Sequence, residues 1–317
     1  MKVHPEQKTI AIVNQDNHDL RPMKRREFLW KSGVLALGAG FGPNLSALAG
    51  ADKPGQVNAT KLGWKVSVQH YTYRRYSTFE ALEKAAAVGL RYFEVRSDLK
   101  LGPQWPGKSA NETMPEDARK EFKSRVAGLG LSIPSVFADF NGKPDQAKRL
   151  FAFWEDFGTE VIVAEPPAGS YDMLEKLCEE YKMNLALHNH QRTKSEYWSP
   201  EIVLEICAKR GKYIGACADV GQWARSNLDP VACLRKLQGR LPCIHLKDVL
   251  KKGDLNSRNT VIGEGQADCA NTLKELKRQG YQGVITIDFE HDTPALQEDM
   301  LKNIAFTEEQ ARQLLTQ

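Results

Sequence analysis

The sequence has few features that would connect it with nucleic acids, zinc ribbons or membranes. None of its six cysteines forms a CxxC pair, which excludes a zinc ribbon. The apolar run near the N-terminus is short and broken by glycines, so we expect no stable membrane anchor. Without residues 1–49 the chain has 37 basic and 36 acidic residues. A domain so close to neutrality lacks the excess of positive charge that binds a polyanion, and we predict no nucleic-acid partner.

The first 49 residues differ in character from the rest. Arg25 and Arg26 precede a weakly apolar, glycine-rich stretch that ends in Ala47-Leu48-Ala49. This arrangement resembles a twin-arginine export signal. We therefore expect residues 1–49 to be removed on export to the periplasm and residues 50–64 to form a linker. A disordered basic tail on a cytosolic protein is the alternative. Because twin-arginine export carries folded proteins, we expect the cysteines to be free, buried thiols.

From Lys65 onward, short β-rich runs alternate with helical stretches. The runs are apolar on both faces, as in a parallel sheet that helices cover. Eight such units in about 250 residues predict a single-domain α/β protein, a (β/α)₈ TIM barrel, over residues 65–317. A doubly wound open sheet is the alternative, but no glycine-rich turn follows the first strand. The predicted strands are 65–71, 91–95, 132–137, 160–165, 184–189, 213–218, 241–246 and 284–289.

The last four predicted strands end in side chains of the kind that bind metals. Residues two apart on a strand point to the same side, so each strand can direct its polar residues at one place. In a TIM barrel, this place is the mouth formed by the carboxyl ends of the strands, where active sites lie. Imidazoles and carboxylates together are typical ligands of a catalytic divalent metal. The residues concerned are His188, His190, Asp219, His245, Lys247, Asp288 and Glu290.

Several motifs extend this pattern along the chain. They are "SVQHYTYR", "LHNH", "ADVGQWARSNLDP", "RLPCIHLKDV", "GEG" at 263–265 and "GYQGVITIDFEHD". With them, the chain from about Lys65 to Glu290 resembles the sugar phosphate isomerase/epimerase superfamily, the xylose-isomerase-like barrels. The resemblance implies one Mn²⁺, Co²⁺, Mg²⁺ or Zn²⁺ ion, held by one ligand from each of the last four strands. By position, these ligands are His188, Asp219, His245 and Asp288.

Two residues depart from the pattern of the superfamily. Many of its epimerases have Glu where this chain has His188, and that Glu is half of a carboxylate pair that works on both faces of the sugar. An imidazole there argues against the symmetrical two-carboxylate mechanism. Gln222 stands where the superfamily often has His, which in the repair endonucleases helps to hold a second metal. A multi-metal phosphodiesterase site is therefore disfavoured.

The resemblance also implies the chemistry, which is removal of a proton from a carbon next to a carbonyl. The metal acts as a Lewis acid that stabilises an enediolate, while a carboxylate moves the proton. We expect Glu290 to be this base, although its role and that of Asp288 could be exchanged. His190 is either the second acid/base or a residue that orients His188. Lys247 either neutralises an oxyanion or pairs with an acidic residue at a strand end.

Further polar and aromatic residues near the strand ends are candidates for contacts with a sugar. Strand-end carboxylates also commonly cap a helix or pair with Arg, so each assignment has a structural alternative. The candidate substrate-binding residues are His70, Arg74, Glu94, Glu165 and Trp223, with Trp223 expected on a loop.

Three functions remain open at this point. The leading one is a metal-dependent isomerase or epimerase of an unphosphorylated sugar or keto-sugar. The second is a lyase or dehydratase that expels a β-leaving group from a keto-sugar or 3-keto-glycoside. The third is a barrel that binds sugar without catalysis. Isomerisation keeps the molecular formula of the substrate, whereas elimination yields an enone, so the product distinguishes the first two.

Overall fold

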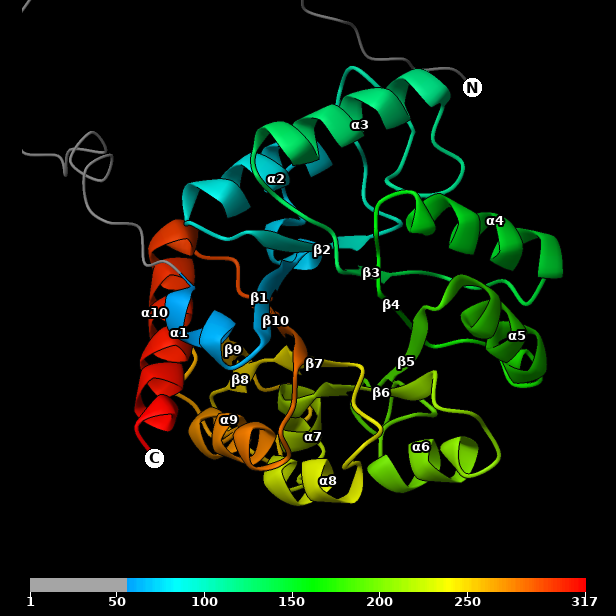
Figure 1. Cartoon of the computed structure of the whole chain (residues 1–317). Helices are drawn as coiled ribbons and strands as arrows, with labels where there is room; N and C mark the ends of the chain where they lie inside the picture. Colours follow the sequence, from blue (N-terminus) through cyan, green and yellow to red (C-terminus); the bar gives the residue numbers. More distant parts are fainter. Residues whose placement is uncertain (1–55) are drawn as a thin grey trace, which may run out of the picture. The chain divides into compact units, whose positions relative to one another are not determined.

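A computed structural model describes residues 56–317. Its centre is a closed barrel of eight parallel strands in the order β1-β10-β7-β6-β5-β4-β3-β2, with helices around it (Figure 1). This confirms the predicted TIM barrel. The barrel strands are β1 (Trp64–Gln69), β2 (Tyr92–Arg96), β3 (Ser135–Phe137), β4 (Val161–Ala164), β5 (Asn184–His188), β6 (Ile214–Asp219), β7 (Cys243–Leu246) and β10 (Gly283–Ile287).

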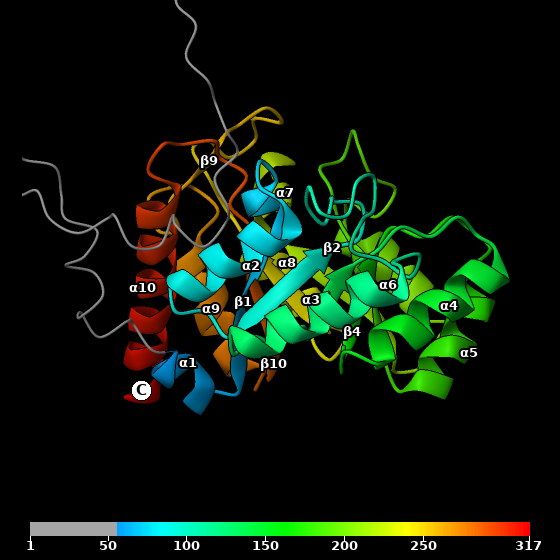
Figure 2. The ribbon, with the colours of Figure 1, turned by 90° about the horizontal axis from the view of Figure 1, so that it is seen from above.

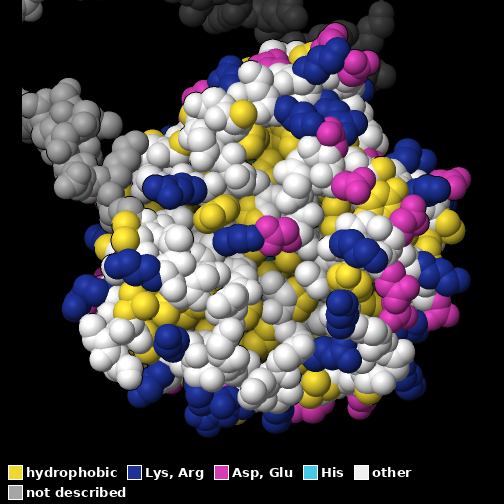
Figure 3. Space-filling view, in the orientation of Figure 1, with side chains coloured by type: hydrophobic (Ala, Val, Ile, Leu, Met, Phe, Trp, Pro, Cys, Tyr) yellow, Lys and Arg dark blue, Asp and Glu magenta, His cyan; other side chains and the backbone are white. Residues whose placement is uncertain are grey.

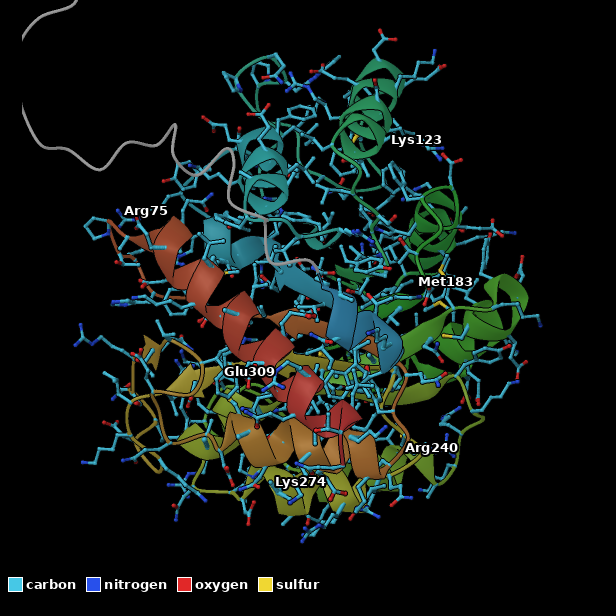
Figure 4. All side chains as sticks on the ribbon, turned by 60° about the vertical axis from the view of Figure 1, so that its left-hand side comes forward. Arg75, Lys123, Met183, Arg240, Lys274 and Glu309 are labelled. Atoms are coloured by element: carbon cyan, nitrogen blue, oxygen red, sulfur yellow. The ribbon has the colours of Figure 1, made fainter. Side chains whose placement is uncertain are left out.

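Most of the helices lie outside the barrel and cover its strands (Figures 1 and 2). Figure 4 shows Lys274 of α9 and Glu309 of α10 on the outer surface. The helical elements are α1 (Val57–Lys61), η2 (His70–Tyr73), α2 (Thr78–Ala87), α3 (Glu116–Gly128), α4 (Pro144–Glu155), α5 (Tyr171–Tyr181), α6 (Pro200–Cys207), α7 (Val220–Arg225), α8 (Pro230–Lys236), α9 (Cys269–Arg278) and α10 (Leu296–Leu315).

Apolar side chains on the two faces of the strands form two cores. The larger core lies between strands and helices and includes Ile244 and Leu246 of β7. The smaller one includes Cys217 and Cys243, which are paired in register on β6 and β7. Because side chains alternate along a strand, Asp219 and His245 follow these cysteines on the same face, one layer nearer the carboxyl ends. The barrel interior thus has a layer of apolar side chains and, nearer the carboxyl ends of the strands, a layer of polar ones.

All six cysteines are buried and unpaired, as expected. Within residues 56–317, no helix combines the length and apolar character needed to cross a membrane. The predicted export signal and its cleavage point lie outside the described residues. The range predicted as a linker, 50–64, contains α1 in its described part. Glu308 of α10 accepts hydrogen bonds from the Asn58 and Ala59 backbone N–H groups, at 2.9 and 3.1 Å.

A small hairpin that we did not predict follows β7. Its strands, β8 (Asp248–Val249) and β9 (Asn259–Thr260), are antiparallel and only two residues long, too short to leave a periodic signal. Figure 2 shows β9 and α7 on the same, upper side of the barrel.

Asp248 organises the chain that follows this hairpin. Its buried carboxylate accepts hydrogen bonds from the backbone N–H groups of Val249, Gly263, Gly265 and Ala267, at 2.9 to 3.1 Å. Gly265 has to be a glycine, because a Cβ there would lie 2.2 Å from Asp248 Oδ1. The "GEG" motif therefore wraps around a buried carboxylate at the end of β7.

We predict that Asp248→Ala lowers the free energy of unfolding by roughly 3 kcal/mol or more, because it leaves several buried N–H donors without an acceptor. Urea unfolding followed by circular dichroism measures this change. Asp254→Ala is the matched control, since Asp254 Oδ1 accepts one local bond, from Asn256 N at 2.9 Å. Equal effects of the two substitutions would contradict the role given to Asp248.

Candidate active site

The predicted ligands lie at the carboxyl ends of four neighbouring strands. His188 ends β5 and Asp219 ends β6, while His245 is on β7 and Asp288 directly follows β10. Asp219 and His245 are paired in the strand register. Three of these residues, His188, Asp219 and His245, bring one ligand atom each to within 4.8 Å of one another, and all three are buried. The sequence thus located a compact group of metal-type ligands.

The hydrogen bonding of this group fits a cation. Asp219 Oδ2 and both ring nitrogens of His245 are buried without a well-directed hydrogen bond, although Oδ2 lies 3.0 Å from Lys247 Nζ and His245 Nε2 lies 2.8 Å from Glu94 Oε1. His188 Nε2 lies 3.6 Å from Asp219 Oδ2, and the two imidazole rings are 5.0 Å apart at their centroids. Buried polar atoms without partners are costly, whereas a divalent ion would satisfy them together. The residues therefore match the ligand set of a metal such as Zn²⁺, Mn²⁺ or Co²⁺.

Asp219 is held in place by its own helix and by the preceding strand. Its Oδ1 caps α7 by accepting a hydrogen bond from Gln222 N at 2.9 Å. Asn189 bonds both backbone groups of Asp219: its Nδ2 donates to Asp219 O at 3.0 Å, and its Oδ1 accepts from Asp219 N at 2.9 Å. These contacts leave Oδ2 to face Lys247 and His188. Asn189, in the middle of "LHNH", was missed because only the structure shows its partner.

Glu165 orients His188 and His190 together. Its Oε1 accepts from His188 Nδ1 at 3.0 Å and also pairs with His190 Nδ1. Burial alone would raise the pKa of Glu165, but the hydrogen bonds from the two histidines outweigh it and bring the pKa well below its usual range. An ionised Glu165 can only accept, so both Nδ1 atoms carry the proton. In the neutral tautomer this leaves each Nε2 with a lone pair, and a carboxylate that orients a histidine in this way is common at metal sites.

Glu94 has a corresponding position next to His245. Its Oε1 lies 2.8 Å from His245 Nε2, although out of line for a hydrogen bond, and its Oε2 accepts from Ser135 Oγ at 2.7 Å and Thr286 Oγ1 at 3.2 Å. Burial would lower the pKa of His245, but the Glu94 carboxylate raises it to about 10. Glu94 is 0 % exposed. We had expected it to contact sugar hydroxyls, but in the structure it supports His245 from the barrel interior.

Lys247 is the central cation of the mouth. Its Nζ lies 2.8 Å from Asp288 Oδ2, 2.9 Å from Glu290 Oε1 and 3.0 Å from Asp219 Oδ2. Burial disfavours the ammonium, but these carboxylates raise the pKa of Lys247 above its usual value. Of the two alternatives considered, the structure shows the ion pair with strand-end acids.

Asp288 faces Lys247 more closely than it faces the histidines. Its Oδ2 is 3.7 Å from His245 Nδ1, and its Oδ1 is buried without a partner. Asp288 therefore lies outside the compact group of three, and would have to share its carboxylate between Lys247 and a metal.

Three residues of the site reach solvent. The side chains of His190, Glu290 and Glu165 are 34 %, 28 % and 23 % exposed, whereas those of His188, Asp219, His245 and Lys247 are at most 3 % exposed. Glu290 follows β10 and His190 follows β5, on different sides of the mouth. The arrangement combines a buried group of ligands with two accessible acid/base groups.

The three remaining residues expected to contact a sugar are either ion-paired or buried in the structure. Arg74 pairs with Asp292 at 2.7 Å, and its guanidinium lies 5.0 Å from the centre of the Tyr71 ring. His70 is fully buried and accepts from Arg96 N at 3.4 Å; burial, reinforced by Arg96, lowers the pKa of His70 to about 3. Trp223 is in α7 rather than on a loop and is 1 % exposed, because α7 begins directly after Asp219 and turns Trp223 into the core.

The opposite end of the barrel contains a cavity of about 370 Å³. Glu160, Asn184, Arg240 and Tyr281 contribute to its lining. Figure 3 shows the face at this end, with a basic and an acidic side chain side by side near its centre. Among residues 56–317, two groups of metal-type ligands lie at the carboxyl end instead: His188, Asp219 and His245, and Glu165, His188 and His190.

Gly221 provides the space for the buried stem of Lys247. A Cβ on Gly221 would lie 2.5 Å from Lys247 Cγ and 2.9 Å from both Lys247 Cβ and Cδ. We predict that Gly221→Ala lowers the free energy of unfolding by about 1–3 kcal/mol through overpacking. Gly128→Ala is the control, because a Cβ at Gly128 of α3 meets nothing within 4 Å. Urea unfolding of both variants checks the prediction. A Gly221→Ala variant with an unchanged free energy of unfolding would contradict the close packing of Lys247 against Gly221.

Parts of this chain are similar to known proteins. Residues 168–310, which include β5, β6, β7 and β10, match the family described as xylose isomerase-like TIM barrel. The rhizopine catabolism protein MocC of Rhizobium meliloti is 28 % identical over 153 residues, which cover 44 % of this chain and 43 % of that protein. An inosose dehydratase of Mesomycoplasma hyopneumoniae is 27 % identical over 133 residues, covering 37 % and 44 %. Each match thus spans less than half of the relative's length.

A solved structure resembles a larger part of the chain. The crystal structure of an uncharacterized protein from Parabacteroides distasonis superposes with a TM-score of 0.62 at 27 % sequence identity. The superposition covers 77 % of this chain and 98 % of that one. The similarity therefore extends over the barrel as a whole.

Proposed function

We propose that this protein is a divalent-metal-dependent enzyme of the xylose isomerase-like barrel family. In this proposal it acts on an unphosphorylated keto-sugar or related polyol ketone and eliminates a β-leaving group. The observation that carries the proposal is the buried group of His188, Asp219 and His245 beneath two accessible acid/base residues of different chemistry, Glu290 and His190.

The metal would be held by His188, Asp219 and His245, with Asp288 as a shared further ligand. Two imidazoles in the set favour Mn²⁺, Co²⁺ or Zn²⁺ over Mg²⁺. When bound, the ion supplies a Lewis acid that polarises the carbonyl of the substrate. Glu165 and Glu94 keep the two histidines in place.

Glu290 is the proposed base. Burial raises the pKa of Glu290, but the adjacent Lys247 ammonium outweighs this effect, so the pKa lies below its usual value and the carboxylate is ionised at neutral pH. Lys247 also fixes the direction of the carboxylate through the 2.9 Å contact with Oε1. Glu290 can then take the proton from the carbon next to the substrate carbonyl.

His190 is the proposed acid. Glu165 holds its Nδ1, so Nε2 remains for the substrate. In its imidazolium form His190 also carries a proton on Nε2, and this proton passes to the leaving oxygen on the β-carbon as the C–O bond breaks. The C–H and C–O bonds are lost, a C=C bond forms, and water or an alcohol departs. The partial match to an inosose dehydratase supports this assignment over an epimerase, and so does His188 in the place where many epimerases have Glu.

An unphosphorylated substrate agrees with the charges of the mouth. Lys247 is surrounded by three carboxylates, and Arg74 is paired with Asp292. These two cations are therefore already neutralised and are not offered to a phosphate. We further propose that the enzyme acts in the periplasm, on the basis of the twin-arginine pattern in the sequence.

Isomerisation or epimerisation is the second candidate. Glu290 is an accessible carboxylate, and one carboxylate can move a proton between adjacent carbons. The same base would then return the proton to the substrate, and no group would leave. His190 is not required for this reaction, so the two functions differ in their dependence on His190.

Metal binding is the first prediction from this proposal. The purified protein should hold about one equivalent of Mn²⁺, Co²⁺ or Zn²⁺, and His245→Ala should lose it because the group of three is broken. Plasma mass spectrometry after dialysis measures the content. His291→Ala is the control, as His291 is nearby but outside the group. A wild-type protein that stays metal-free after metal is supplied would overturn the proposal.

The second prediction concerns the reaction. With keto-inositols and 3-keto-glycosides, the product should be lighter than the substrate by water or by the departing alcohol, and should absorb as an enone. Glu290→Gln should lower kcat by about 10²–10⁴-fold with metal content unchanged, because it removes the base. Mass spectrometry and ultraviolet absorbance follow the product. A product of unchanged formula that takes up solvent deuterium would select isomerisation instead, and a fully active Glu290→Gln would exclude Glu290 as the base.

A further inference from the structure

The Lys247 ammonium has the surroundings of a bound metal cation. Three carboxylates from two strand ends, Asp219 after β6 and Asp288 and Glu290 after β10, place one oxygen each within 2.8–3.0 Å of Nζ. The lysine side chain is 1 % exposed, so the ammonium is shielded from solvent at the point where these oxygens meet. Three carboxylate oxygens converging on one buried point are the kind of site that binds a divalent ion.

The position is shaped for a lysine. The aliphatic stem runs across Gly221, where a single added methyl group would lie 2.5 Å from Lys247 Cγ. Gly221 is in α7, two residues after Asp219. The segment that provides the Asp219 ligand therefore also provides the space through which Lys247 reaches it.

Asp219 connects this position with the group of three ligands. Its Oδ2 is 3.0 Å from Lys247 Nζ and 3.6 Å from His188 Nε2. Asp288 is similar, with Oδ2 at 2.8 Å from Nζ and 3.7 Å from His245 Nδ1. Each of these carboxylate oxygens is thus close to both the ammonium and an imidazole nitrogen. In two-metal sites the ions are about 3.5–4 Å apart and act as a pair.

We propose that Lys247 is a built-in cation that takes the place of a second divalent ion and so restricts the site to one metal. This inference rests on the proposed metal site at His188, Asp219 and His245. A tethered ammonium offsets one of the three carboxylate charges, where a divalent ion would offset two, and it cannot be removed by a chelator. It also keeps Glu290 as an acid/base residue, because an ion at this point would use that carboxylate as a ligand.

The test compares the metal stoichiometry of the wild type with that of Lys247→Met. Methionine keeps an apolar stem over Gly221 but is one atom shorter, so it removes the charge and vacates the Nζ position. After equilibration with Mn²⁺ and dialysis, we expect about one equivalent in the wild type and about two in the variant. Electron paramagnetic resonance should show an isolated Mn²⁺ ion in the wild type and an exchange-coupled pair in the variant.

Lys212→Met is the matched control, since Lys212 is exposed at the other end of the barrel and should leave the stoichiometry at one. Lys247→Gln, which is neutral and polar, makes the same test if the Met variant does not fold. One equivalent, or none, in folded Lys247 variants overturns this inference while the wild-type site stands. A wild type without metal overturns the proposed metal site and this inference with it.

Discussion

The mouth of this barrel depends on the neutralisation of buried carboxylates. Asp219, Asp288 and Glu290 converge on one ammonium, that of Lys247. Burying one such charge without a partner would cost several kcal/mol. Removing one member of a buried ion pair therefore destabilises the fold strongly, because the other charge is left buried without compensation. The positions of these side chains are therefore mutually dependent, and Gly221 is part of that dependence because it makes room for the lysine.

The three histidines of the site are each supported by a carboxylate. Glu165 holds His188 and His190, and Glu94 lies beside His245. Each carboxylate comes from a different strand, β4 or β2, so the closed barrel brings the supporting residues and the ligands together. The apolar layer with Cys217 and Cys243 lies next to Asp219 and His245, one layer further from the carboxyl ends of the strands. Rigid support of this kind leaves Glu290 and His190 as the groups that can respond to a substrate.

The sequence predicted the barrel and the ligand strands well because both depend on local patterns. Alternation along β6 and β7 places Asp219 and His245 on one face, and the strand ends set their common level. Contacts between distant strands leave no such pattern. The roles of Glu94 and Asn189 depend on partners 151 and 30 residues away, His245 and Asp219, and so could not be read from spacing. Trp223 was misplaced because the six-residue α7 is too short for a periodic signal.

Crystals of the protein grown with Mn²⁺ offer the most direct test of the account. Anomalous diffraction locates the ion independently of any assumption about its ligands. The account predicts one strong peak, in contact with His188, Asp219 and His245, with Lys247 still bound to Asp288 and Glu290. A peak at Glu165 and His190, two peaks, or no peak at the carboxyl end of the barrel would contradict it.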